Sequence, residues 1–294
     1  MGRTGIAATT ALLCALLSQA TVSAKSAPLE PLEAVSVLTL DGRIVIEPDG
    51  HVSDVSIDTK LAPTLAAVVR QHVLAWRFKP VSVGGEARQV KTFLHMGLAA
   101  ADTGGKYRVW VDSVRFPDSP QSVEQRVDGE PEPIRAGKLR LPNYPYELQA
   151  RGLMATILLA IRVTPEGTTG DVVAVQSMYY DFNQRKWPSP KGLKSLESNA
   201  MNSARHWTLK VPPAAARTPD QMTVVVPVHY TMGVDLNTPG VWVKVQRTPQ
   251  RDIGWLPLQR DSIKLGIANL SGGGVSQYGA GPTLLGEVAG VPLL

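Results

Sequence analysis

The sequence has little of what most catalytic or nucleic-acid-binding proteins depend on. It contains one cysteine, Cys14, among 294 residues. Because the rest of the chain has no cysteine, it cannot form a disulfide, a thiolate metal site or a cysteine nucleophile there. Charged residues make up 19% of the chain, the net charge is +5, and no run of five basic residues occurs. Because nucleic-acid binding needs lysines and arginines gathered on one face, we expect no nucleic-acid partner.

Long hydrophobic runs are also absent. The N-terminal run from Ile6 to Leu17 follows Arg3 and is shorter than the roughly 20 residues of a membrane-spanning helix. Val22 and Ala24 place small residues at the −3 and −1 positions of a signal-peptidase site. We therefore expect residues 1–24 to be a signal peptide that is cleaved after Ala24. The alternative is an uncleaved N-terminus that anchors the protein in the inner membrane.

Catalytic signatures are missing from the sequence. It has no Gly-x-Ser-x-Gly elbow and no His-Glu-x-x-His motif, and the glycines at 272–274 lack the Lys-Ser/Thr ending of a phosphate loop. Two acidic pairs, Asp49/Asp54 and Glu166/Asp171, flank predicted turns, which explains them without catalysis. We expect no enzyme activity, no cofactor and no metal. The open alternative is an enzyme whose site lies in residues 181–192 or in the C-terminal tail.

One pattern occurs twice in the chain. In residues 44–57 it predicts a strand, a Pro48-Asp49-Gly50 turn and a return strand. Apolar residues, Trp76 among them, then recur at helical spacing over about 61–78, and residues 89–97 predict a closing strand. These features, with a preceding strand over 34–40, form the predicted first unit, residues 34–98.

The second copy covers residues 138–233. Strands are expected at about 154–164 and 171–180 around the Pro165-Glu166-Gly167 turn, a helix at about 193–208 that includes Trp207, and a closing strand at 222–230. The distance from the turn glycine to the tryptophan is longer here because residues 182–194 form a polar insertion. The buried tryptophans are expected to pack each helix onto its sheet.

The remaining segments fit around these two units. Residues 99–137 are interpreted as a connector that contains its own strand from Tyr107, and residues 234–294 as a Gly/Pro-rich tail, with a strand at 241–245 and poor order from Ser271 onward. The predicted fold is therefore α+β: two tandem ββαβ units, each a three-stranded antiparallel sheet with one helix across a face.

At these residues the chain resembles the C-terminal domain of TonB, the periplasmic energy transducer. The similarity lies in Tyr144-Pro145, Gly152, Pro165-Glu166-Gly167 and Trp207 of the second unit, and in Pro48-Asp49-Gly50 and Trp76-Arg-Phe-Lys-Pro80 of the first. The resemblance implies the ββαβ fold, a periplasmic location and the binding of an extended peptide, from an outer-membrane receptor plug, that adds a strand to the sheet edge.

This resemblance assigns the candidate contact residues. Two strand segments, Val90–Leu94 and Thr223–Tyr230, are the expected pairing edges, and Tyr144-Pro145 is a further contact. The candidate protein-binding residues are Tyr144, Pro145, Thr223, Val224, Val225, Val226, Val228, Tyr230, Val90, Thr92, Phe93 and Leu94. Pro227 lies inside the second edge and cannot donate to a ladder.

Two functional interpretations follow. In the first, the protein binds segments of envelope proteins, with a link to TonB-dependent transport across the outer membrane. A TonB transducer needs a lasting membrane anchor and a long Pro-rich spacer, whereas residues 25–33 alone separate the predicted cleavage site from the first unit. In the second, the units pair with each other or across a homodimer and serve as a scaffold.

Overall fold

The computed structural model of the chain describes residues 31–116, 132–180, 190–213, 217–234, 236, 238–256, 274–278, 281–286 and 288–293. The predicted signal peptide and residues 181–189 lie outside this part. Among the described residues, no helix combines the length and the hydropathy needed to cross a bilayer.

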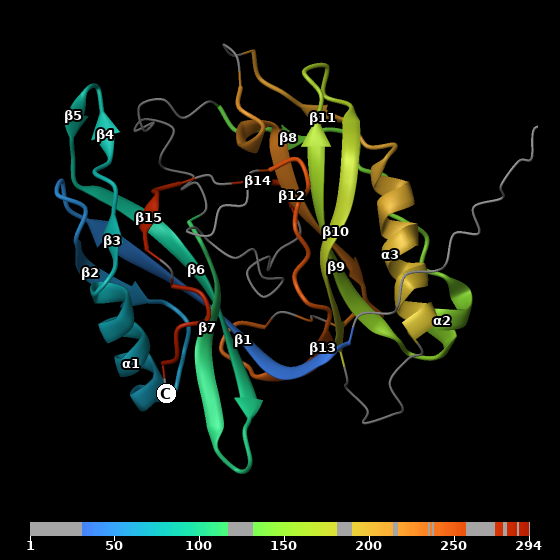
Figure 1. Ribbon diagram of the computed structural model, residues 1–294, viewed down its shortest axis with the longest axis horizontal. Coiled ribbons are helices and arrows are strands. Elements are labelled where there is room, and N and C mark those ends of the chain that lie inside the picture. The colour runs from blue at the N-terminus through green and yellow to red at the C-terminus, as the bar shows by residue number, and fades with distance from the viewer. Residues whose placement is uncertain are drawn as a thin grey trace, which may run out of the picture.

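The largest element of the described chain is one antiparallel sheet of nine strands (Figure 1). Its strands, in spatial order, are β14 (Ser276–Gln277), β12 (Thr223–Tyr230), β9 (Met154–Val163), β10 (Thr169–Tyr180), β13 (Val243–Arg247), β1 (Glu33–Ile46), β6 (Val90–Asp102) and β7 (Tyr107–Arg115), with β2 (Val52–Ile57) paired to β1. The fold is thus α+β with a mainly antiparallel sheet, as the sequence predicts.

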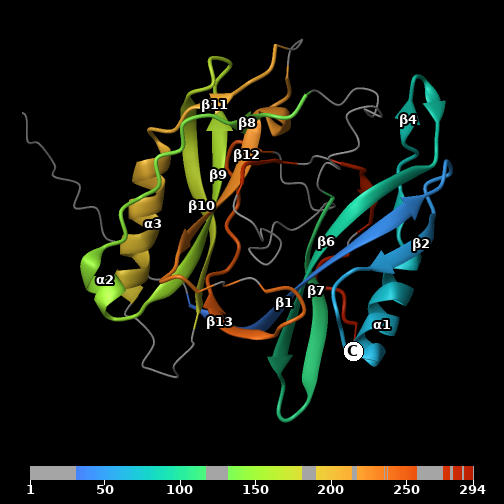
Figure 2. The ribbon, with the colours of Figure 1, turned by 180° about the vertical axis from the view of Figure 1, so that it is seen from behind.

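Shorter elements complete the fold. The helices are α1 (Pro63–Leu74), α2 (Tyr146–Ala150) and α3 (Pro190–Ala204), and Asp220–Met222 forms one 3₁₀ turn. Three two-stranded pairs are β3 (Arg77–Phe78) with β15 (Leu284–Leu285), β8 (Arg135–Ala136) with β11 (Leu209–Lys210), and β4 (Ser82–Val83) with β5 (Glu86–Ala87). Helices α1 and α3 lie at opposite sides of the molecule, as Figures 1 and 2 show from the front and from behind.

Three clusters of buried side chains fill the molecule. Val69 and Val73 of α1 belong to a first core with β1, β2 and β6, and Leu196 and Ala200 of α3 to a second core with β9 and β12. A central core lies on the other face of the second hairpin. There Leu158, Ala160 and Val225 meet Val35 and Val37 of β1. Strands β9 and β12 are therefore buried on both faces, which explains their nearly continuous apolar sequences.

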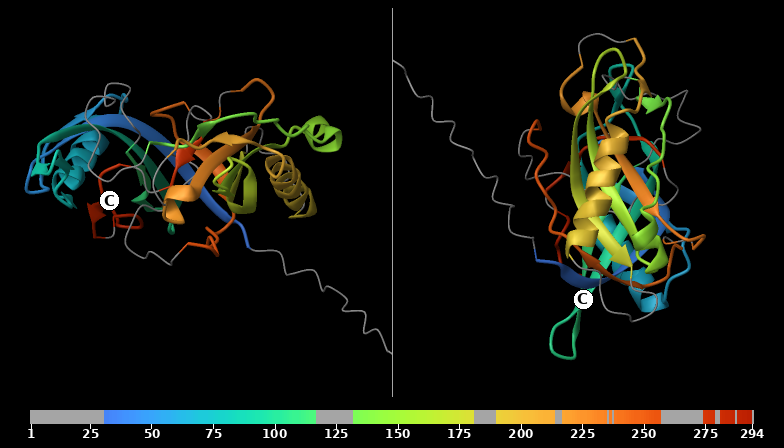
Figure 3. Two further views of the ribbon diagram at one scale, coloured as in Figure 1. Left: turned by 90° about the horizontal axis from the view of Figure 1, so that it is seen from above. Right: turned by 90° about the vertical axis from the view of Figure 1, so that its right-hand side faces the viewer.

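The two hairpins are joined through β13. This strand pairs with residues 33–37 of β1 on one side and with Met178–Tyr180 of β10 on the other. The side chain of Arg247 in β13, only 7% exposed, contacts Glu33 at 2.8 Å and Asp112 at 2.6 Å. In Figure 3, seen from above, β1 arcs across the molecule from the α1 side to the α3 side.

The architecture differs from the sequence prediction in its connections. Instead of two separate three-stranded sheets, a single sheet forms because β13 bridges them. The two predicted strands at 34–40 and 43–47 are one strand, β1, because β6 pairs with it along its whole length from residue 36. Helix α1 ends at Leu74 rather than near Phe78, which is part of β3. In the described part of the expected tail, three strands form: β13, β14 and β15.

Candidate functional site

Each hairpin turn is tied to the short strand that follows its tryptophan. The amide of Phe78 donates to the carbonyl of Gly50 at 2.8 Å, and the amide of Leu209 donates to that of Gly167 at 2.7 Å. Both glycines have positive φ, +86° and +80°, and a Cβ on either would collide with the carbonyl oxygen of Phe78 or Leu209. Both turns therefore require glycine for conformation and for close approach.

The two tryptophans occupy the cores, as predicted. Trp76 is 4% exposed and Trp207 is 1% exposed, and both lie just beyond the C-terminal end of their helix. The indole Nε1 of Trp207 donates to the carbonyl of Arg140 at 2.7 Å. The Nε1 of Trp76 is buried and has no hydrogen-bond partner among the described residues. Both rings serve packing rather than surface contact.

The candidate edge on β12 offers its backbone but not its side chains. Thr223, Val224, Val225, Val226, Val228 and Tyr230 are all buried. The whole strand pairs with β9, and the opposite side of its first half is covered by β14 through Val224–Gln277 and Val225–Ser276. Any contact with a partner along β12 would therefore use backbone groups.

Pro227 limits this edge. The carbonyl of Thr223 accepts the amide of Tyr278 at 2.9 Å, so Thr223 directs its backbone groups away from β9. Because backbone groups alternate along a strand, residue 227 faces the same outer side, where proline presents a carbonyl and no N–H. The proline fits the ladder to β9 but leaves a gap in any ladder that continues outward.

The other candidate edge lies in the first part of β6. Val90, Thr92 and Leu94 pair with Ile46, Ile44 and Gly42 of β1. Pairing with β7 begins at His95, opposite Arg115. Within the described ranges, residues 90–94 have a strand partner on one side only.

The outward backbone groups of this segment can be assigned. The carbonyl of Asp41 accepts the amide of Asp58 on the β2 side of β1. The backbone N–H and C=O groups of the even-numbered β1 residues therefore point toward β6. Their partners in β6 are also even-numbered and point their backbone groups toward β1. The backbone groups of Lys91 and Phe93 consequently point away from β1. The side chains of Thr92 and Leu94 are buried, whereas Phe93 is half-buried and Lys91 is exposed.

Tyr144 and Pro145 pack within the protein and are not exposed contact residues of the β6 or β12 edge. Pro145 is the residue before α2, and the ring of Tyr144 packs edge-on against Tyr230 with centroids 5.2 Å apart. The Tyr144 hydroxyl is buried with no partner in the described part, and burial raises the pKa of this tyrosine to about 12. The pair connects α2 to the end of β12.

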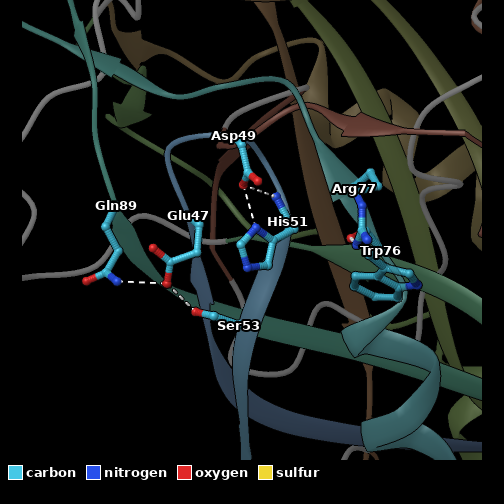
Figure 4. Close-up of polar contacts among 7 residues, drawn as sticks. All are labelled: Glu47, Asp49, His51, Ser53, Trp76, Arg77 and Gln89. Atoms are coloured by element: carbon cyan, nitrogen blue, oxygen red, sulfur yellow. Dashed lines mark hydrogen bonds and ion pairs between the residues drawn. The ribbon is translucent and has the colours of Figure 1, made fainter.

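The turn of the first hairpin gathers several polar side chains (Figure 4). Asp49 accepts hydrogen bonds from the amide and the Nδ1 of His51, at 3.1 and 2.5 Å, and these bonds lower the pKa of Asp49. Glu47 accepts from the Ser53 hydroxyl and from Gln89 Nε2, which lowers its pKa. Ser53 thus faces a carboxylate rather than the histidine, so the group lacks the nucleophile–base pairing of a hydrolase. It ties the turn to the chain entering β6.

Sequence reasoning missed the segments that cover the edges. β14 pairs with β12, β15 pairs with β3, and Gly290 and Leu293 donate to Val111 and Val109 of β7 at 2.7 and 2.8 Å. Two-residue strands in a glycine-rich sequence carry no periodic signal, so only the isolated apolar residues of this segment could have indicated packing.

Within the described ranges, His, Asp and Glu side chains do not gather in groups of three or more that could hold a metal ion. No model of a known protein family matches the sequence, and comparisons with curated proteins and with solved structures likewise found no match.

Proposed function

We propose that this chain is an exported, periplasmic protein that binds segments of other envelope proteins by strand addition, in the manner of the TonB C-terminal domain. Its two halves are proposed to be copies of one ββαβ unit. The matching glycine contacts at Gly50 and Gly167 support this, since each closes a hairpin onto the strand that follows a buried tryptophan. An uncleaved inner-membrane anchor is the alternative to a soluble periplasmic form.

The observation that carries the proposal is that, within the part of the chain that the structure describes, Val90–Leu94 have a strand partner on one side. A strand paired on one side presents a row of N–H and C=O groups to an added chain. Lys91 and Phe93 supply this row, and the half-buried Phe93 ring adds apolar surface beside it. An extended segment from an outer-membrane receptor plug or another envelope protein is the proposed occupant.

Proline substitution tests this edge without touching its side-chain packing. Lys91→Pro removes an outward N–H next to the start of β6, where proline is tolerated. Lys91→Ala is the matched control, because it removes the exposed side chain and keeps the N–H. Binding to an array of overlapping receptor-plug peptides should weaken at least about tenfold in Lys91→Pro, the loss of roughly 1.4 kcal/mol, and persist in Lys91→Ala. Unchanged binding in Lys91→Pro would place the contact elsewhere. A purified protein that binds no peptide but turns over a substrate would refute the proposal.

A scaffold role is the second candidate, and β13 favours it. This strand pairs with parts of both β1 and β10, so the two halves are joined into one sheet by strand pairing within one chain. A structural protein with self-paired sheets, alone or as a homodimer, would need no transport partner. Sedimentation and hydrogen exchange separate the two candidates, because a monomer whose Lys91 and Phe93 amides exchange rapidly argues against the scaffold.

A further inference from the structure

The C-terminal strap, defined here as the described residues among 274–293, contacts both ends of the nine-stranded sheet. At one end β14 pairs with β12, and at the other Gly290 donates to Val111 of β7. These are the two outermost long strands of the sheet. The strap therefore occupies the places that an added strand from another protein would take.

The strap is held unequally along its length. Leu284 and Val288 are 3% and 9% exposed and belong to the first core. By contrast, β14 forms two residue pairs, its own side chains, Ser276 and Gln277, are polar, and the apolar residues that flank it, Val275 and Tyr278, are only partly buried against the cores. Segments with few buried apolar contacts open locally at a small fraction of the global free energy of unfolding. β14 is therefore the part of the strap that is easiest to release.

Arg115 of β7 contacts β14, although the two strands lie at opposite ends of the strand order. Its Nη1 donates to the Ser276 hydroxyl at 2.5 Å, and its Nε is buried without a partner in the described part. The nearby carboxylate of Asp41 is engaged by the Nδ1 of His95. A partly buried guanidinium thus has a neutral hydroxyl as its direct partner, where a carboxylate would add an opposite charge and could accept two parallel N–H bonds.

We propose that β14 is a resident strand that an incoming segment displaces from β12, and that the incoming segment carries Asp or Glu at the place of Ser276. This inference extends the proposed function from the β6 edge to a second pairing edge, on β12. The incoming strand would pair with Val224 and Val225 as β14 does and donate to the Thr223 carbonyl as Tyr278 does, while Leu284 and Val288 keep the rest of the strap attached. The carboxylate would pair with Arg115 and select acidic segments.

A reversible lock tests the displacement. The pair Val224–Gln277 lies between hydrogen-bonded pairs, where the Cα separation of about 4.5 Å suits a disulfide. We would introduce Val224→Cys and Gln277→Cys together in full-length protein carrying Cys14→Ser. The probes are two labelled nonapeptides with the sequence of residues 272–280, one native and one with Ser276→Asp.

The expected result has three parts. The Asp-containing peptide binds the reduced protein at least tenfold more tightly than the native peptide, and oxidation abolishes this binding. Arg115→Gln removes the preference between the peptides, whereas Arg108→Gln, on an exposed arginine of the same strand, retains it. Circular dichroism checks that each variant is folded, and Arg115→Lys, which keeps the charge, should preserve the preference if Arg115→Gln does not fold.

Two outcomes would overturn the inference. If neither peptide binds and the Tyr278 amide exchanges only through global unfolding, β14 is a permanent part of the sheet. If receptor-plug peptides bind with the same affinity to the locked and unlocked protein and remain sensitive to Lys91→Pro, the proposed function stands at β6 and the displacement is wrong. Lock-sensitive binding of the Asp-containing peptide, without binding to any plug peptide, would instead support the displacement and refute transport as the function.

Discussion

The two hairpins of this molecule meet their short third strands through the same contacts, but different parts of the chain complete them. Strand β11 of the second hairpin is covered by β8, which precedes it in sequence, whereas β3 of the first is covered by β15 from the C-terminal strap. Covering β3 from the far end of the chain makes the first half depend on the last residues. The contact between each hairpin turn and its short third strand is therefore the same in both halves, but the segment that pairs with the third strand differs.

The outer edges differ in the same way. On β12 the outward side carries Pro227 and is partly covered by β14, whereas residues 90–94 of β6 keep their donors and, in the described ranges, have a strand partner on one side. A missing donor discourages long ladders, which is one means by which proteins protect sheet edges. Among the described residues, the first half thus presents the less protected edge.

The largest expected effect comes from the contact that the halves share. Gly50→Ala and Gly167→Ala would each force a residue with positive φ and a Cβ against a backbone carbonyl. We expect each to lower the free energy of unfolding by about 3 kcal/mol or more. Gly84→Ala is the control, because its φ is +65° but nothing lies within 4 Å of the added Cβ, so its cost should stay near 1 kcal/mol. Urea denaturation measures all three, and a Gly50→Ala cost as small as the control would end the equivalence of the two turns.

A difference between the halves predicts the next effect. Trp207→Phe removes one of two donors to the Arg140 carbonyl and leaves the Ser203 hydroxyl, whereas Trp76→Phe removes an indole N–H that has no partner in the described part. Both substitutions remove similar apolar volume, so that loss largely cancels between them. Trp207→Phe should cost about 0.5–1.5 kcal/mol more than Trp76→Phe, the usual net contribution of one hydrogen bond. Denaturation followed by circular dichroism tests this, and equal costs would show that the Arg140 hydrogen bond contributes little.

Sequence alone predicted the parts of the fold that depend on local chemistry. The Pro-x-Gly turns, the hairpins and the buried tryptophans follow from turn residues and periodicity, which act over a few positions. The joining of the sheets through β13 did not follow, because alternation around Val243 predicts a strand but not its neighbours. The end of α1 was misplaced since Phe78 is drawn into β3 by Gly50 and Leu284, which are distant in sequence.

The candidate site was predictable to a similar degree. Periodicity and the family resemblance located the strands β6 and β12, but not which of their sides is covered. That depends on Ser276 and Gln277, whose two-residue pairing leaves no periodic signal in the sequence. The contact of Arg115 with Ser276 was equally hidden, because the two residues lie 161 positions apart.

The smallest expected effect concerns the aromatic pair that precedes the second hairpin. The Tyr144 hydroxyl is buried without a partner in the described part, so Tyr144→Phe should change the free energy of unfolding near pH 7 by no more than about 0.5 kcal/mol. Burial raises the folded-state pKa of Tyr144 to about 12, whereas the unfolded chain ionises near 10. Between these values the folded state holds more protons than the unfolded state, so its stability falls as pH rises.

Tyr144→Phe removes this ionisation and should flatten the decline in stability between about pH 10 and pH 12. Denaturation midpoints at pH 9 and pH 11 provide the measurement. Tyr146→Phe, at a side chain that is 80% exposed, controls for the loss of a hydroxyl as such. If Tyr144→Phe instead weakened the protein at pH 7 and abolished peptide binding, the hydroxyl would be a contact of the binding surface. The second half would then carry a partner-facing group that the first half lacks, and the β6 edge would no longer account for recognition alone.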